Sequence, residues 1–250
     1  SGKTVESNWA DLNVGDNYTV VYTYDELRNA IHGTPIGLTC RVRLGSDIIQ
    51  KDTRNYGGML IANNANFYLD LNGYTLSRTA VTNDIQLFEI TTGKLTIDDS
   101  KGGGQIICDM EGASLFRLCE ADAHLIINGG TFTSKQGYCI FSTDGTTEIN
   151  DGTFRGMVHT VNFTGGNMVF YGGNFLVPFG PGASHTLAMT SDYGDFQFME
   201  ATVQGTISIS GKGNSSPPFL VYHVTNFTDI YINGRQMTVG DRVSELTGNP

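Results

Sequence analysis

The segment Leu125-Ile126-Ile127-Asn128-Gly129-Gly130-Thr131-Phe132 joins a short apolar strand to a further apolar residue through a tight turn of Asn and Gly. Related segments recur along most of the chain, and the apolar residue before each turn serves as a marker. Successive markers lie about 20 to 35 residues apart, a spacing typical of solenoid repeats. The markers are Leu71, Ile97, Ile127, Ile149, Phe170, Phe198 and Ile232.

A second apolar strand precedes most markers at a short and nearly constant distance, whereas the stretch after each turn varies in length. Apolar and polar residues alternate within these strands, which directs one face inward and the other to solvent. One copy cannot bury its apolar face alone, but stacked copies share a continuous core. The second strands are Leu87–Ile90, Leu115–Leu118, Cys139–Phe141, Thr160–Phe163, Thr186–Met189 and Phe219–Tyr222.

The first residues differ from the repeats. Thr23 followed by Glu26 is the reciprocal capping pattern of a helix N-terminus. We expect a short amphipathic helix near residues 24–31 that closes the open end of the stack, because an exposed coil presents apolar side chains and unpaired strand edges. The predicted organisation is an N-terminal extension at 1–20, one solenoid domain at 21–240 that includes this helix, and a C-terminal tail at 241–250.

Composition restricts the partners. The 250 residues include 32 glycines and carry a formal net charge of -10. Nucleic acids and anionic lipids require clustered Lys and Arg, so neither is an expected partner. The sequence has no apolar run of about 18 residues, so no membrane insertion is expected.

The order of strand, loop, strand, Asn-Gly turn and variable loop resembles the right-handed parallel β-helix of the pectin-lyase-like superfamily. The opening Tyr24–Ile31 and the motif Gly129-Gly130-Thr131-Phe132 also resemble secreted or surface β-helix proteins of gut bacteria. The resemblance implies an all-β, single-stranded, right-handed parallel β-helix with a capping helix, located outside the cell or at its surface. That superfamily includes lyases, hydrolases, epimerases, phage tailspikes and adhesins, so the resemblance does not select an activity.

The tight bends of this fold would hold a ladder of amide and carboxylate side chains. Asn tolerates left-handed backbone angles, and its amide can bond the neighbouring coil. We interpret this ladder as structural. Its members are Asn72, Asp98, Asn128, Asn150 and Asn233.

In enzymes that this chain resembles, the substrate groove lies over the strand series that includes Phe88–Ile90. Alternation predicts an outward column of Glu89, Arg117, Ile140, Asn162, Ala188 and Tyr222. Asp122 and Asp144 follow the strands of this series. The hypothesised catalytic set is therefore Glu89, Arg117, Asp122 and Asp144, either as glycosidase acid and base or as a lyase that holds calcium.

Aromatic residues gather in the C-terminal half and suit the apolar faces of sugars. The predicted carbohydrate-binding residues are Asn162, Tyr171, Tyr193 and Tyr222.

His159 and His185 should stack in adjacent coils, either as a surface pair or as two ligands of a transition metal. The four cysteines lack Cys-x-x-Cys spacing, so buried free thiols are predicted, with a Cys119–Cys139 disulfide as the alternative. They are Cys40, Cys108, Cys119 and Cys139.

The predicted function is noncatalytic binding of a polysaccharide, glycan or host surface, without a cofactor. The first alternative is a polysaccharide lyase, with calcium, or a glycoside hydrolase acting over Glu89 and Arg117. The second alternative is a structural stalk or a phage-type spike segment, for which trimeric assembly would be expected.

Overall fold

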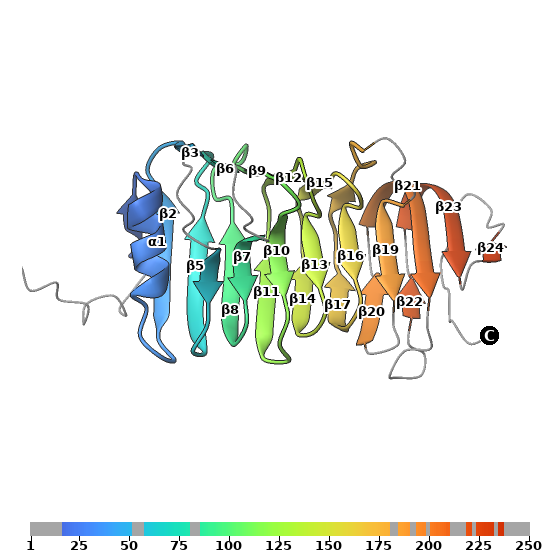
Figure 1. The fold of residues 1–250 in the computed structure, drawn as a ribbon, viewed down its shortest axis with the longest axis horizontal. Coiled ribbons are helices and arrows are strands. Elements are labelled where there is room, and N and C mark those ends of the chain that lie inside the picture. The colour runs from blue at the N-terminus through green and yellow to red at the C-terminus, as the bar shows by residue number, and fades with distance from the viewer. Residues whose placement is uncertain are drawn as a thin grey trace, which may run out of the picture.

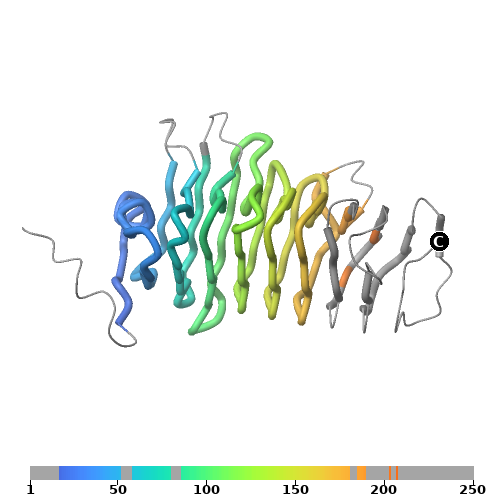
Figure 2. Tube along the Cα trace, turned by 90° about the horizontal axis from the view of Figure 1, so that it is seen from below, coloured from blue at the N-terminus to red at the C-terminus, as the bar shows by residue number. Residues whose placement is uncertain are grey.

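The chain forms a parallel β-solenoid whose coils stack along one long axis (Figures 1 and 2). The computed structural model describes residues 17–51, 58–80, 86–180, 185–190, 194–198, 201–210, 219–221, 224–232 and 235–237. Each regular coil contributes one strand to each of three faces, here called A, B and C. The prediction of a repetitive all-β solenoid is confirmed.

Face A is a nine-stranded parallel sheet within the described residues. In spatial order it contains β1 (Thr19–Val21), β2 (Thr39–Leu44), β5 (Ala65–Asp70), β8 (Gly93–Asp98), β11 (Ala123–Ile127), β14 (Thr146–Ile149), β17 (Gly166–Phe170), β20 (Gly194–Phe198) and β22 (Phe219–Val221).

Faces B and C have parallel strands as well. Face B contains β3 (Ile48–Lys51), β6 (Thr75–Ala80), β9 (Gln105–Met110), β12 (Thr131–Ser134), β15 (Thr153–Arg155) and β18 (Asn174–Phe175). Face C contains β4 (Met59–Ile61), β7 (Gln86–Ile90), β10 (Ser114–Leu118), β13 (Ile140–Ser142), β16 (Val161–Phe163) and β19 (Leu187–Thr190). The long strand β21 (Ala201–Ser210) pairs with both β18 and β19, and β23 (Val224–Ile232) joins β21 to the antiparallel β24 (Arg235–Met237).

The marker residues of face A are in register from coil to coil, with two corrections. Ile97, Ile127, Ile149, Phe170 and Phe198 pair in succession. Leu69, not Leu71, pairs with Ile97, because the turn of this coil begins two residues further along. Ile232 pairs with Ile209 of β21 and therefore lies outside face A.

The second strand series is confirmed for β7, β10, β13, β16 and β19 but not for its last copy. Phe219–Val221 pairs with β20 of face A, because β21 alone continues faces B and C in that coil. Arg117 pairs with Phe141 instead of Ile140, which is buried. Two consecutive residues, Cys139 and Ile140, are buried at this corner. Counting by strict alternation therefore assigns Ile140, instead of Phe141, to the outward column. Ser208 follows Ala188 in this column, and Tyr222 lies outside the described residues.

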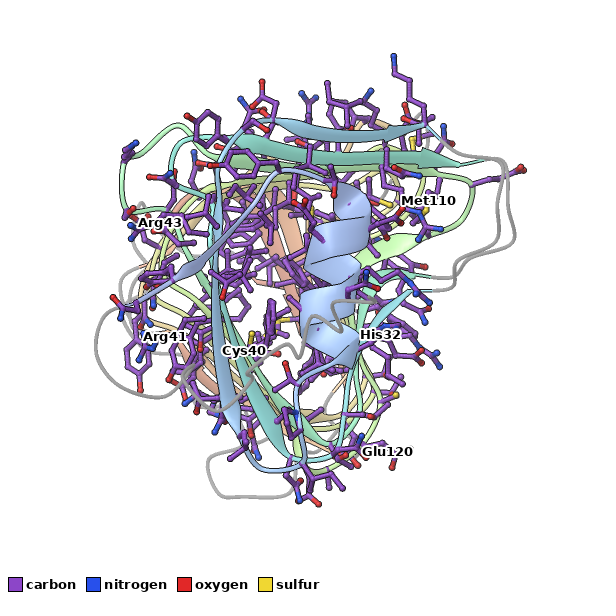
Figure 3. The ribbon with its side chains drawn as sticks, turned by 90° about the vertical axis from the view of Figure 1, so that its left-hand side faces the viewer. His32, Cys40, Arg41, Arg43, Met110 and Glu120 are labelled. Atoms are coloured by element: carbon purple, nitrogen blue, oxygen red, sulfur yellow. The ribbon has the colours of Figure 1, made fainter. Side chains whose placement is uncertain are left out.

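Helix α1 (Tyr24–His32) lies across the N-terminal end of the stack (Figures 1 and 3). Its predicted capping box is present: Thr23 Oγ1 accepts from the Glu26 N–H at 3.2 Å, and the Glu26 carboxylate accepts from the Thr23 N–H at 3.2 Å. The helix buries Tyr24, Leu27, Ala30 and Ile31 in the shared core. Its apolar face is therefore continuous with the interior of the solenoid.

The polar ladder between faces A and B is confirmed for the four predicted members that lie within the described residues, each of which bonds a neighbouring coil. The Asn128 Nδ2 donates to Asp98 Oδ1 at 2.6 Å, and the Asn150 Nδ2 donates to Asn128 Oδ1 at 2.7 Å. Asn72 has the left-handed backbone that the prediction allows (φ 52°), and its Nδ2 donates to the Leu44 carbonyl of the neighbouring coil at 2.9 Å. Asn233 lies outside the described residues.

Aromatic rings stack inside face B. Phe132, Phe154 and Phe175 are fully buried, and both neighbouring pairs of rings have centroids 4.9 Å apart.

All four cysteines are free, three of them buried and Cys119 partly exposed. Burial raises the pKa of the Cys139 thiol to about 12. The prediction of buried free thiols is confirmed for Cys40, Cys108 and Cys139, Cys119 is free but partly exposed, and the alternative disulfide is wrong.

Candidate functional site

The outer surface of face C carries two parallel columns of side chains, which we call the face C strip. The first column contains Glu89, Arg117, Phe141 and Asn162, which are paired from coil to coil. The second contains Tyr138, His159 and His185, which come just before strands β13, β16 and β19. These seven side chains are all partly exposed, so the strip faces solvent over several coils.

One end of the strip is polar and is organised around Glu89. The Arg117 Nη1 donates to Glu89 Oε1 at 3.1 Å, and the Gln86 Nε2 donates to Glu89 Oε2 at 2.7 Å. Arg117 and Glu89 are 28% and 26% exposed, so the ion pair adds no more than about 1 kcal/mol to folding. Arg117 Nε and Gln86 Oε1 are buried without a hydrogen-bond partner in the described part of the chain. This end therefore retains unused hydrogen-bonding capacity.

The other end of the strip is built from rings. Tyr138 contacts Phe141 with centroids 5.7 Å apart, and it stacks on His159 at 5.9 Å with an interplanar angle of 7°. His159 and His185 follow at 5.9 Å. The predicted position of the two histidines one above the other in adjacent coils is therefore confirmed, with their rings tilted by 34°, and Tyr138 extends the row by one coil.

The protonation state of the histidines follows from their contacts. The His159 Nδ1 lies 2.9 Å from the His185 carbonyl oxygen, and since a carbonyl can only accept, Nδ1 carries the proton. Burial, and then the charge of His159, lower the pKa of His185. The lowered pKa keeps the His185 ring uncharged at neutral pH.

The other predicted site residues lie elsewhere. Asp122 and Asp144 occupy the corner between faces C and A, where the Asp144 Oδ1 accepts from the Gly145 N–H at 2.8 Å and supports the turn. Tyr171 is 50% exposed in the turn between β17 and β18, which joins face A to face B. Tyr193 and Tyr222 lie outside the described residues. Of the four predicted catalytic residues, Glu89 and Arg117 are in direct side-chain contact.

Within the described ranges, no three His, Cys, Asp or Glu side chains group closely enough to hold a metal ion. The same ranges contain no helix long and apolar enough to span a membrane.

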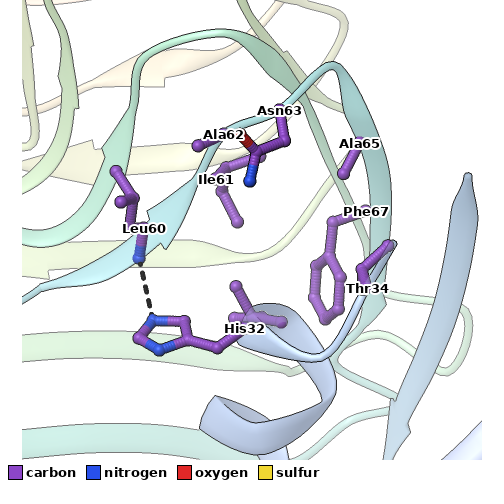
Figure 4. Close-up of a pocket in the computed structure, with 9 residues that line it drawn as sticks. His32, Thr34, Leu60, Ile61, Ala62, Asn63, Ala65 and Phe67 are labelled. Atoms are coloured by element: carbon purple, nitrogen blue, oxygen red, sulfur yellow. Dashed lines mark hydrogen bonds between the residues drawn. The ribbon is translucent and has the colours of Figure 1, made fainter. Parts of the chain in front are cut away.

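A small open cavity lies beside the C-terminal end of α1 (Figure 4). It encloses about 250 Å³ between His32, Leu60, Asn63 and Phe67. The His32 Nε2 accepts from the Leu60 N–H at 3.4 Å, and burial together with the charge of Arg28 lowers the pKa of His32. The lining is thus uncharged at neutral pH. None of the site residues predicted from the sequence lines this cavity.

Comparison of the chain with protein-family models, with curated proteins and with solved structures gave no match. The functional interpretation therefore depends on the geometry of the chain itself.

The sequence analysis missed Tyr138 and Phe141 as members of the strip. The signal for Tyr138 is its position two residues before Ile140, which corresponds to His159 before Val161 and to His185 before Leu187. Aligning the copies on their inward residues, instead of counting by alternation, would have found both rings.

Proposed function

We propose that this chain is a noncatalytic carbohydrate-binding β-helix protein and that a glycan lies along the face C strip. The observation that carries the proposal is the run of neighbouring, partly exposed rings from Tyr138 to His185 beside a column that contains Glu89, Arg117 and Asn162. Sugars present apolar C–H faces that pack on rings, and their hydroxyls require hydrogen-bonding partners next to those rings.

The strip offers both kinds of contact in a fixed arrangement. Tyr138 is held between Phe141 and His159, so little side-chain freedom remains to be lost when a ligand binds. Asn162 follows Phe141 in the next coil and can donate and accept hydrogen bonds. Glu89 is held by two donors and acts here as a positioned acceptor and not as a proton donor. An extended polysaccharide along the solenoid axis would meet rings at one end and charged groups at the other.

The handedness of the solenoid, the role of α1 and the location of the protein are part of the same proposal. We infer a right-handed helix of the pectin-lyase-like type, because parallel strands of one sheet are joined almost always by right-handed crossovers. The burial of the apolar face of α1 in the common core supports a capping role for this helix. A secreted or cell-surface location is proposed with the glycan-binding function.

The test is a glycan array with the wild-type chain and with Tyr138→Ala and Phe141→Ala. Both substitutions should abolish or strongly weaken the selected glycan interaction, because each removes a ring from the strip. Tyr171→Ala is the control, since it removes an exposed ring at a different corner. Equal binding by all four proteins would refute the proposed site.

The enzymatic alternative is tested on the glycans that bind. Reducing ends and unsaturated uronates are measured after long incubation with the wild type and with Glu89→Gln. We expect no product from either protein. Product release by the wild type that disappears in Glu89→Gln would replace the binding function with a hydrolase or lyase.

A further inference from the structure

The N-terminal part of face A carries cations although the whole chain has a formal net charge of -10. Arg41 and Arg43 project from β2, and Lys94 projects from β8, two strands further along the stack. Figure 3 shows Arg41 and Arg43 on one side of the solenoid. All three side chains are partly exposed.

Aromatic rings fix the orientation of both arginines. The Arg41 guanidinium lies 4.3 Å from the centroid of the Tyr68 ring, and the Arg43 guanidinium lies at the same distance from Tyr18. A stacked guanidinium keeps its planar set of donors oriented, which suits bidentate contact with a carboxylate or a sulfate.

The two arginines differ in their charge balance. The Arg43 Nε donates to the buried Asp70 carboxylate at 2.8 Å, so the charge of Arg43 is largely neutralised. Arg41 and Lys94 have no ion pair with any carboxylate among the described residues. They are therefore the two cations of this surface that remain available to an external anion.

The sheet register sets how far apart the backbone positions of Arg41 and Lys94 lie. Arg41 pairs with Tyr68, and Lys94 pairs with Asn66 of the same intervening strand. Two strand spacings across the sheet and two residues along it place the Cα atoms of Arg41 and Lys94 about 12 Å apart, from roughly 4.8 Å per strand and 3.3 Å per residue. Asn66 and Tyr68 lie between them on β5.

We propose that this surface, the face A patch of Arg41, Asn66, Tyr68 and Lys94, binds an acidic polysaccharide. Arg41 would hold one carboxylate or sulfate, Lys94 would hold a second one further along the ligand, and the Asn66 amide would bond sugar hydroxyls between them. The flat sheet surface suits an extended chain whose charges recur at intervals. At physiological salt the Debye length is about 8 Å, so most of the remaining negative charge of the protein is screened from this surface.

The patch lies on a different face from the glycan strip, so the two proposals can fail independently. Binding is measured by calorimetry with dextran sulfate as the probe, with uncharged dextran of the same length and with poly-glutamate for comparison. We expect binding of dextran sulfate that weakens as salt increases, and no binding of dextran. Poly-glutamate bound as tightly as dextran sulfate would overturn the assignment to a polysaccharide.

Substitutions locate the interaction. Arg41→Gln and Lys94→Gln should each weaken dextran sulfate binding about three- to fivefold, the loss expected for one exposed ionic contact. Lys135→Gln removes the same charge from face B, where Lys135 pairs with Asp109, and should leave binding unchanged. Wild-type affinity in the Arg41→Gln, Lys94→Gln double variant, with an unchanged melting curve, would overturn the proposal.

Discussion

Replacing Phe154 by Ala tests the stacked core of the solenoid. Phe154 is fully buried in face B, and its ring lies between Phe132 in one neighbouring coil and Phe175 in the other. Both ring pairs are nearly parallel, with interplanar angles of 13° and 10°. The substitution therefore removes a ring that joins three successive coils.

The expected loss in the free energy of unfolding is about 4–5 kcal/mol. Truncation of a buried Phe to Ala costs about 3–5 kcal/mol, because transfer energy is lost and a cavity remains. The upper half of that range applies here, since each stacked pair adds about 0.5–1.5 kcal/mol beyond the area it buries. Relaxation of the cavity is restricted on both sides by rings whose strands are fixed in register.

Urea unfolding followed by circular dichroism measures this loss through the transition midpoint. Tyr171→Ala is the matched control, because that ring is 50% exposed and its removal should cost less than about 0.5 kcal/mol. A double-mutant cycle with Phe175→Ala should give a coupling of about 1 kcal/mol. If Phe154→Ala shifts the midpoint no further than Tyr171→Ala does, the inferred register of the core is wrong.

Three further substitutions test other parts of the fold. Burial alone would raise the pKa of Asp70, but hydrogen bonds from Ser100, Arg43 and Asn72 outweigh it and lower this pKa. Asp70 therefore stabilises the fold above its unfolded pKa of about 3.9, and the contribution is lost as pH falls through the lower folded value. Asp70→Asn should destabilise the chain at pH 7 and narrow its gap to the wild type at low pH; a gap independent of pH would contradict this. Thr23→Ala should cost about 1 kcal/mol through loss of the α1 cap, measured by thermal melting, and an unchanged melting temperature would count against the capping box. Ile127→Asp places a charge in the core between coils and should abolish the cooperative transition in circular dichroism, so a wild-type melting curve would refute the face A register.

Local patterns in the sequence were sufficient to predict a repeat of short strands and the helix near the N-terminus. The capping box of α1 depends on two residues three positions apart, and both of its hydrogen bonds are present. The ladder of Asp98, Asn128 and Asn150 was predictable because Asp98 ends a strand of face A, Asn128 and Asn150 directly follow the next two, and these strands are stacked in register. The contact of Glu89 with Arg117 was predictable in the same way, because the two residues occupy the same position in adjacent strands that are stacked in register.

Assignment of strands to faces required the tertiary structure. Phe219–Val221 has the apolar pattern of a face C strand but pairs in face A, because one long strand, β21, occupies two faces in the preceding coil. Phe141 replaces Ile140 in the outward column because the corner before β13 buries two consecutive residues. Corner geometry depends on how coils pack and not on the composition of any one segment.

The sequence by itself determined that this chain is a stack of short strands with an apolar interior, because the repeat of apolar residues requires burial against neighbouring copies. It did not determine which polar and aromatic residues meet on the outside. Tyr138 with His159, and Arg41 with Tyr68, are neighbours in space across a whole coil of chain. The tertiary structure decided these surfaces, since the register between coils is set by the inward residues and the outward residues follow it.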